Sequence, residues 1–220
     1  MTENVELDRS GSTIYRLAKD HETLRTAAIL EQEVWNEMGY GSLDEYSELI
    51  ADSRTFTAHD RDRCVGVTRM FGHVTGRTQP FLLLPFDDLV LFETLADGAC
   101  KGIVEELGTV AVARDRRRDG MVSASLWRIA YRDAVNRGIR YWGIIMEPQH
   151  VRAMNRIFGF TFKQAGPTVD YQGGMCAAHY LDLVEVDYSV RERRPDVWEW
   201  FVNVPLHAPT IPDTTSGRET

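Results

Sequence analysis

The sequence predicts an α/β protein in which a mixed, mostly antiparallel central sheet is flanked by helices. Its 220 residues suffice for one well-filled domain and are few for two. Its apolar and charged fractions, 43% and 26%, are those of an ordinary globular protein. The expected elements begin with strands and continue as a strand–helix–strand–helix–strand series. We expect one domain over residues 1–190 and a C-terminal extension, partly disordered, over residues 191–220.

The first half of the chain predicts a long helix among strands. Residues 21–38 carry Leu24 and Ala28 near the helical period, and Gly39 ends the helix. A second, short helix is expected at residues 43–51. The strands expected in this half lie at residues 12–17, 55–59 and 64–71, and the last two form an antiparallel hairpin.

The second half predicts two further helices. The first covers residues 120–136, where apolar residues follow an i, i+4, i+7, i+8 stripe. The second begins at Pro148 and ends at Gly159. Residues 88–95 fit either a helix or a loop. The strands expected in this half lie at residues 103–113, 139–146, 160–164 and 177–184.

Composition excludes several classes of function. The net charge of −8 argues against a protein that coats nucleic acid. We find neither a membrane-length apolar run nor a signal peptide, and we therefore expect a cytoplasmic protein. The three cysteines and the histidines lack ligand spacing, so we expect free thiols and no metal. The sequence also lacks the glycine-rich nucleotide motifs and the G-x-S-x-G of serine hydrolases.

One basic cluster stands out in this acidic chain. It comprises Arg114, Arg116, Arg117 and Arg118. Such a cluster fits a solvated loop or an anion site, and its position directly before Gly120 and a helix favours the anion site. Amides at a helix start are unsatisfied within the helix, and the helix dipole is positive there. A glycine allows a phosphate to approach the backbone closely.

This stretch resembles motif A of the GNAT (general N-acetyltransferase) enzymes, whose pattern is Q/R-x-x-G-x-G/A. Here it reads Arg117-Arg118-Asp119-Gly120-Met121-Val122, and the final valine is a mild departure. Residues 154–160 resemble the helix of that family that ends in Gly-Phe. The resemblance implies the GNAT fold and a pantetheine thioester as cosubstrate, with no tightly bound cofactor. It implies binding of this cosubstrate at Val110, Val112, Arg117, Arg118, Gly120, Met121 and Val122.

Within that superfamily, most of the chain resembles the acyl-homoserine-lactone synthases and the related long-chain N-acyl amino acid synthases. The matching segments are Arg25 with Trp35, and residues 44–46, 65–70, 106–112 and 155–160. Two departures are informative. Ser47 replaces the second Asp of the D-x-x-D segment, and Thr109 replaces the Arg of E-x-x-R. Because lactone synthases use both charges around S-adenosylmethionine, their loss favours a different amine acceptor.

Glu106 is the expected general base. An amine is protonated near neutral pH and must lose a proton before it attacks the thioester. A carboxylate on a central strand can accept that proton if burial raises its pKa. The alternative, equally compatible with the sequence, is that Glu106 only pairs with Arg69. Glu105 is expected to face the opposite side of the sheet.

Four residues are expected to contact the acceptor: Arg25, Trp35, Asp44 and Arg69. The two guanidinium groups match an acceptor carboxylate, although Arg25 and Arg69 also fit structural ion pairs with Asp44 or Glu106. For Trp35, two roles are compatible with the sequence: an aromatic wall of the cleft, or a clamp on the substrate. Tyr171 is the expected proton donor to the leaving thiolate. Because a thiolate is a good leaving group on its own, the reaction does not strictly require such a donor.

The donor group is expected on an acyl carrier protein, with coenzyme A as the alternative. Carrier proteins are acidic, so a basic mouth would attract one, whereas a solvated basic face would bind only the phosphates of coenzyme A. The mouth is expected from Arg114, Arg116, Arg118, Arg128 and Arg132. We predict an N-acyltransferase that acylates a small amine in specialised-metabolite or signal biosynthesis. The alternatives are a lactone synthase using S-adenosylmethionine and a non-catalytic acyl-thioester sensor.

Overall fold

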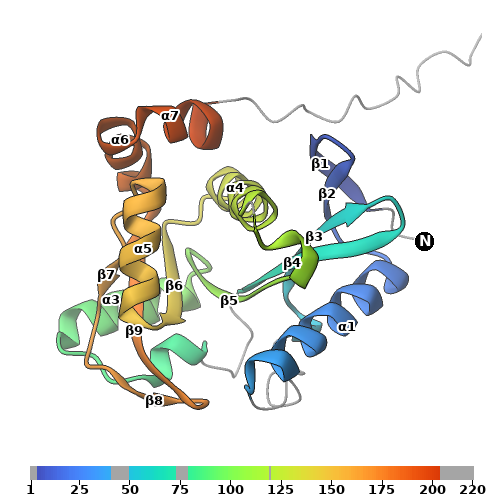
Figure 1. The fold of residues 1–220 in the computed structure, drawn as a ribbon. Helices are drawn as coiled ribbons and strands as arrows, with labels where there is room; N and C mark the ends of the chain where they lie inside the picture. Colours follow the sequence, from blue (N-terminus) through green and yellow to red (C-terminus); the bar gives the residue numbers. More distant parts are fainter. Residues whose placement is uncertain (1–3, 41–49, 73–78, 119, 204–220) are drawn as a thin grey trace, which may run out of the picture.

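The computed structural model describes residues 4–40, 50–72, 79–118 and 120–203. Within these residues, nine strands form one sheet in the order β1-β2-β3-β4-β5-β6-β9-β7, and β8 pairs with β9 (Figure 1). The strands are β1 (Val5–Ser10), β2 (Thr13–Leu17), β3 (Arg54–Asp60), β4 (Arg63–Phe71), β5 (Val104–Val112), β6 (Tyr141–Met146), β7 (Lys163–Gln164), β8 (Val169–Tyr171) and β9 (Gly174–Asp182). The β5–β6 pair is parallel and the other described pairs are antiparallel. The predicted mixed, mostly antiparallel sheet is confirmed.

Helices cover both faces of this sheet. They are α1 (His21–Met38), α3 (Leu89–Cys100), α4 (Met121–Asn136), α5 (Pro148–Phe158), α6 (Leu183–Arg193) and α7 (Pro195–Trp198), with the short turns η2 (Pro80–Leu83), η3 (Arg114–Arg116) and η4 (Glu199–Asn203). Figure 1 shows α1 and α4 on opposite sides of β3 and β4. None of the described helices is both long and apolar enough to cross a membrane.

Local signals place the helix ends where the sequence predicts them. The side chain of Asp20 accepts a hydrogen bond from the Thr23 amide and caps α1 at its start. Gly39 and Gly159 end α1 and α5 in the left-handed conformation, with φ of 74° and 77°. The helices predicted at 21–38, 120–136 and 148–159 are therefore confirmed to within a residue at each end.

Other expectations need correction. β1 and the short β8 are additional strands that the sequence analysis did not identify. For residues 88–95, where the sequence fits either a helix or a loop, the structure has a helix from Leu89 onward, and the Asp88 carboxylate caps it by accepting hydrogen bonds from two amides at the start of α3. Residues 183–184 begin α6 rather than ending a strand, since Asp182 caps that helix. The helix expected at 43–51 lies mostly outside the described residues.

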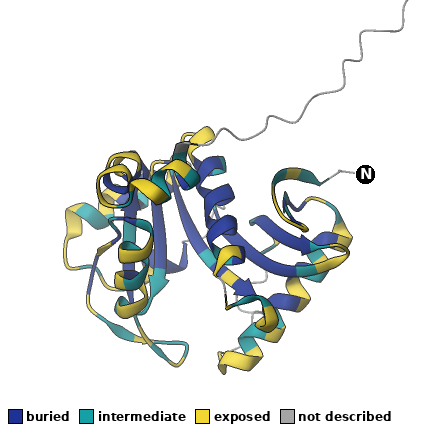
Figure 2. Ribbon diagram, turned by 45° about the horizontal axis from the view of Figure 1, so that its top comes forward, coloured by how far each residue is buried: buried dark blue, intermediate teal, exposed yellow. Residues whose placement is uncertain are grey.

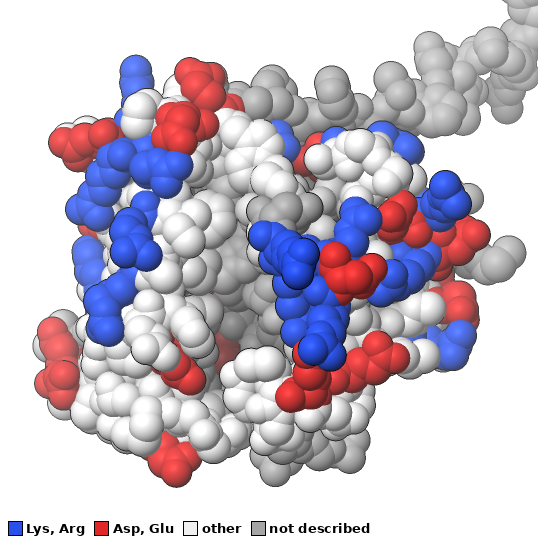
Figure 3. Space-filling view, in the orientation of Figure 1, with Lys and Arg blue, Asp and Glu red and all other residues white. Residues whose placement is uncertain are grey.

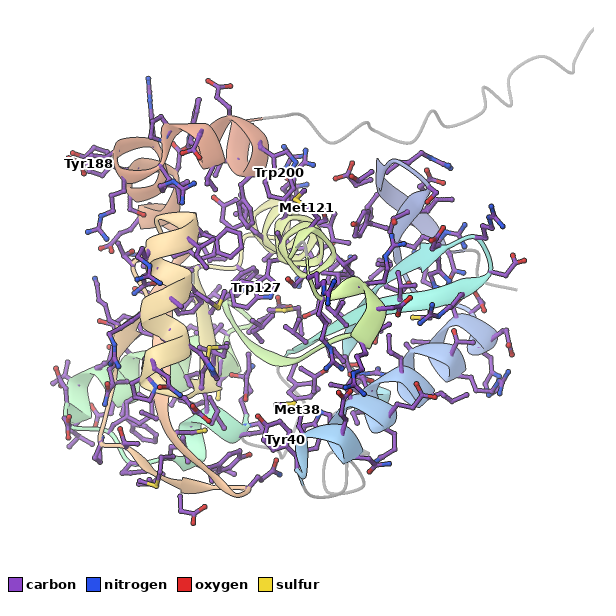
Figure 4. The ribbon with its side chains drawn as sticks, viewed as in Figure 1. Met38, Tyr40, Met121, Trp127, Tyr188 and Trp200 are labelled. Atoms are coloured by element: carbon purple, nitrogen blue, oxygen red, sulfur yellow. The ribbon has the colours of Figure 1, made fainter. Side chains whose placement is uncertain are left out.

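An aromatic cluster joins the C-terminal residues to the core. The ring of Phe201 is fully buried and lies 5.4 Å from Tyr131 and 5.2 Å from Phe160, measured between centroids. Trp127 of α4 points between α4 and α5, where it stacks on Phe160 (Figure 4). Figure 2 shows that α4 and the central strands consist mostly of buried residues. The chain therefore packs on the body as far as η4, and α6 runs across the domain boundary expected after residue 190.

Candidate active site

The candidate site lies where two parallel strands separate. β5 and β6 are paired at three successive positions, of which Glu106 opposite Gly143 is the last. Beyond that pair the strands diverge, and a cavity of about 240 Å³ lies between them. Its lining comes from the end of α1, the end of β4, η2, β5, β6, the start of α5 and the β8–β9 hairpin: Trp35, Tyr40, Phe71, Pro80, Glu106, Leu107, Gly108, Thr109, Val110, Ile144, Ile145, Met146, Glu147, His150, Tyr171, Gln172, Gly174 and Cys176.

Glu106 lines this cavity at the point where β5 and β6 are last paired. The residue is only 3% exposed, and its Oε2 atom accepts a hydrogen bond of 3.1 Å from the Phe81 amide. Burial raises the pKa of the Glu106 carboxyl to about 8, and the Phe81 hydrogen bond opposes the rise only in part. Gly143 pairs with Glu106 on the neighbouring strand. A larger residue would not fit at position 143, because the ring of Phe81 occupies the place of its Cβ atom. Glu106 is thus a buried carboxyl that faces the cavity.

A bulge in β5 shapes the wall next to Glu106. Arg69 pairs with Thr109 and Met70 with Leu107, so that Gly108 is the extra residue. The ring of Phe71 fills the space where a Cβ atom at position 108 would lie. This position therefore requires glycine, and the bulge changes the direction of β5 at the cavity.

Arg69 is part of a buried network that excludes its expected ion pair with Glu106. Its Nε atom donates to Glu31 at 2.7 Å, and neither side chain is more than 2% exposed. Glu31 also accepts a hydrogen bond from the Thr109 hydroxyl. Arg69 additionally donates to Thr55 at 2.8 Å. A carboxylate from α1 is thus the partner of Arg69, because α1 packs directly on β4 and β5.

Glu105 faces away from the cavity, as strand alternation predicts. Its carboxylate accepts two hydrogen bonds from Arg137 at 2.5 and 2.7 Å. The adjacent glutamates of β5 therefore have separate environments, one charge-paired and one facing the cavity.

Aromatic and polar groups form the outer part of the cavity. Trp35 and Tyr40 meet edge to face with their centroids 5.5 Å apart. Tyr40 lies just past the end of α1, on its side toward the β8–β9 hairpin (Figure 4). Burial and the nearby charge of Glu147 raise the pKa of the Tyr40 phenol. Tyr171 from β8 lines the same cavity.

The amino terminus of α4 has the form expected of an anion site. Gly120 precedes the helix with φ of 68°, a conformation that favours glycine. Gly120 has no side chain to cap the first amides of the helix, and such amides at a helix start are donors that an anion can use. The Val122 side chain is buried against Gly66 of β4, which explains an apolar residue where motif A has a small one.

The comparisons with known proteins agree with this geometry. A family model described as N-acyl amino acid synthase FeeM matches residues 25–183. The chain belongs to the FeeM family. It is therefore an acyltransferase enzyme of the GNAT fold. No curated protein matches its sequence.

Solved structures share the fold of this FeeM-family chain at low sequence identity. FeeM, an N-acyl amino acid synthase from uncultured soil microbes, superposes with a TM-score of 0.64 at 18% identity, over 80% of this chain and 94% of FeeM. The homoserine-lactone synthase LasI gives 0.59 at 19% identity, over 79% and 91% of the two chains. The coenzyme-A-dependent lactone synthase BjaI gives 0.51 at 21% identity, over 79% of each chain.

The arginine cluster of the FeeM-family chain is used largely for internal contacts. Arg117 donates to the Val112 carbonyl at 2.7 Å and pairs with Glu37. Arg116 pairs with Asp60 at 2.9 Å. Arg114 lies 3.8 Å from Glu37 but has a side chain that is 87% exposed, and Arg118 is exposed. The guanidinium groups that remain open to a donor are those of Arg114 and Arg118.

Two arginines expected at the donor mouth are buried instead. Arg128 and Arg132 are each 7% exposed, since they lie on the packed side of α4. Arg128 pairs with Asp8 at 2.7 Å and lies over the Trp200 ring. Burial lowers the pKa of Arg132. Their assignment to the mouth was wrong, because the helical stripe facing the core is wider than the apolar residues alone indicated.

The structure brings some of the expected site residues together at the cavity and places others elsewhere. Glu106, Trp35, Tyr171 and Val110 all line the cavity. Val112 packs in the core, and Arg25 is exposed and pairs with Glu22 at 2.7 Å. Asp44 lies outside the described residues.

Sequence analysis also missed residues that the structure brings to the site. Glu31 lies four residues before Trp35, on the same face of α1, and this helical spacing was a usable signal. Glu147 lies directly after β6, at the end where β5 and β6 diverge. No local pattern marks Tyr40, Gln172 or Cys176 as lining residues.

Proposed function

We propose that this FeeM-family protein transfers an acyl group from a pantetheine thioester on an acyl carrier protein to the amine of a small molecule. The observation that carries the proposal is the opening between β5 and β6, with Glu106 at the last position where the two strands are paired. A narrow slot beside an exposed strand edge fits an extended pantetheine arm, which has amides that pair with a strand. Val110 lies on that edge, on the way to the amino terminus of α4.

In the proposed reaction, Glu106 removes the proton from the acceptor amine, directly or through water. The amine nitrogen then attacks the thioester carbon, and the tetrahedral intermediate collapses as the carbon–sulfur bond breaks. The thiolate leaves with the electron pair and takes a proton, for which we propose Tyr171 as the donor. The nitrogen of the new amide loses its second proton, which returns to the Tyr171 phenolate through water. A base with a pKa near 8 is well matched to an ammonium group, because proton transfer is efficient when the two pKa values are close.

The surface supports a carrier protein as donor. Arg114 and Arg118 are exposed beside the amino terminus of α4, and Arg152 and Arg156 are exposed on α5. Figure 3 shows basic side chains over η3 and, separately, along α5 and α6, with a recessed strip between them. An acidic carrier protein would be attracted to both groups while its pantetheine arm enters the strip. We place the reaction in the cytoplasm, as part of the same proposal.

Lactone synthesis is the weaker candidate. The Thr109 hydroxyl bonds to Glu31 inside the core, where lactone synthases by resemblance have an arginine. This position therefore offers no guanidinium to an acceptor. Membership of an enzyme family also favours catalysis over a sensor role.

A donor panel tests the proposal. The full chain is incubated with decanoyl carrier protein or decanoyl coenzyme A and a mixture of small amines, and the products are identified by mass spectrometry. We expect acyl amides, with kcat/KM at least tenfold higher for the carrier-protein donor. Equal use of coenzyme A would refute the donor assignment, and the absence of any amide would refute the transferase proposal.

A further inference from the structure

We infer that Arg128 and Arg132 of α4 form a binding site for an oxyanion of the phosphate class. Neither residue lines the cavity between β5 and β6, so the site is separate from the proposed reaction and does not depend on it. It involves α4, the edge strand β1 and the turn η4, which is the last described element of the chain. In Figure 1, β1 and the C-terminal helices lie on two sides of α4.

The two arginines are buried like charges that share one carboxylate. Each is 7% exposed, and their positions, four residues apart, lie on the same face of the helix. Arg128 donates to Oδ2 of Asp8 at 2.7 Å, and its guanidinium group lies 5.1 Å from the centre of the Trp200 ring. Burial and the nearby charge of Arg128 lower the pKa of Arg132, and the charge of Asp8 opposes this effect. One carboxylate therefore serves two guanidinium groups.

Each guanidinium group also has a buried nitrogen without a hydrogen-bond acceptor. These atoms are Nε of Arg128 and Nη2 of Arg132, and neither has an acceptor among the residues that the structure describes. An unpaired N–H group of a buried charge costs free energy, so most such groups in folded proteins are paired with protein, water or an ion. The orphan nitrogens thus belong to the same two residues that carry the excess positive charge.

An oxyanion would satisfy both the charge and the hydrogen bonds. Guanidinium groups match the spacing of oxygen atoms in carboxylates and phosphates. Asp8 already supplies a carboxylate to Arg128, and the charge that is still lacking is at Arg132. A phosphate group has oxygen atoms on several sides, so it can accept from both guanidinium groups at once. We therefore expect phosphate to bind better than a single carboxylate.

Titration of the full chain with inorganic phosphate tests the inference. Calorimetry at constant ionic strength, with phosphate replacing chloride, should give a Kd of about 1 mM or below, as for two or three charge-assisted hydrogen bonds. At ten times this Kd, phosphate should raise the melting temperature by about 3–6 °C. Acetate should bind at least tenfold more weakly. Glycerol phosphate in a parallel titration shows whether the site takes the free anion only or also a phosphate monoester.

Three variants locate the site. Arg132→Met removes the guanidinium group, keeps an apolar side chain and should raise the Kd for phosphate at least tenfold. Asp8→Asn removes the competing carboxylate and should lower that Kd severalfold. The control neutralises the exposed arginines beside the amino terminus of α4, Arg114→Ser with Arg118→Ser, and should leave the Kd and the temperature shift unchanged.

The outcomes are distinct. Binding that the control keeps and Arg132→Met loses supports the site. No binding by the parent means that water alone surrounds the two guanidinium groups, and it overturns the inference. Equal binding by the parent and Arg132→Met places the anion elsewhere and overturns it as well. If Arg132→Met fails to fold, Asp8→Asn decides, because a Kd that is not lower than that of the parent overturns the inference.

Discussion

Glu31 of α1 and Arg69 of β4 form an ion pair of 2.7 Å inside the core, where neither side chain is more than 2% exposed. The pair connects the helix that carries Trp35 to the strand next to the cavity. The hydroxyl of Thr109 in β5 also donates a hydrogen bond to the Glu31 carboxylate. The position of one wall of the cavity therefore depends on a charged group that itself does not line the cavity.

Breaking this pair should destabilise the fold. Glu31→Gln leaves the Arg69 charge buried without its partner, and we expect the free energy of unfolding to fall by about 3–5 kcal/mol. Urea denaturation monitored by circular dichroism measures this free energy of unfolding. The double variant Glu31→Gln, Arg69→Met should recover much of the loss, since both charges are then gone. Equal stability of the single variant and the parent would show that the pair contributes little.

Glu106→Gln should abolish most of the turnover. The amide keeps the size of the side chain and accepts the Phe81 hydrogen bond, but it cannot take a proton. Loss of a general base typically lowers kcat by about 10²–10⁴-fold. Steady-state kinetics give this value, with binding of the donor expected to be unchanged. Glu93→Gln, on the exposed surface of α3, serves as the control. Unchanged kcat would remove Glu106 from the mechanism.

The activity of the parent should rise with pH and level off. Glu106 acts as a base only when it is ionised, and its pKa is about 8. We expect kcat/KM to increase about tenfold per pH unit below that value and to reach a plateau above it. A profile of kcat/KM between pH 6 and 9.5 measures the midpoint. A flat profile, as a carboxyl with a midpoint near 4.5 would give over this range, would contradict the assignment of Glu106 as the titrating base.

Stability should depend on pH in the opposite direction. The pKa of Glu106 is about 8 in the folded chain and near 4.5 when unfolded, so the folded state holds the proton between these values. The contribution of Glu106 is complete below pH 4.5 and is lost as the pH rises through 8. Glu106→Gln cannot ionise, and above pH 8 it should exceed the parent in unfolding free energy by a few kcal/mol. Urea unfolding at pH 5 and pH 9 measures this difference, which should be absent at pH 5.

Neutralising the exposed arginines should weaken the binding of the carrier-protein donor only. We expect Arg114→Ser with Arg118→Ser to raise KM for acyl carrier protein about tenfold, and more at low salt, because rim charges act through long-range attraction. A short acyl-pantetheine thioester, which lacks the acidic protein, should be used equally well by both forms. Arg9→Ser, at an exposed position on β1, is the control. A loss that is equal for both donors would assign these arginines to the pantetheine itself.

Much of the fold was predictable because its signals are local. Asp20 and Gly39 delimit α1, and Pro148 and Gly159 delimit α5, through hydrogen bonds and backbone angles within a few residues. The short β8 was missed because three residues carry too little pattern to distinguish a strand from a turn. The position of Glu106 at the cavity follows from strand alternation, which also directs Glu105 to the opposite face.

The amino-acid sequence by itself was enough to predict the helices, most of the strands and the glycine turn before α4. It also carries the resemblance to acyltransferases. Only the tertiary structure decided which charges meet. Arg69 pairs with Glu31, which lies 38 residues away in the sequence, and the arginines of α4 that were expected at the donor mouth are buried. The physical reason is that hydrogen-bond geometry along a helix or turn is local. The partner and the burial of a long charged side chain depend instead on how distant elements pack together.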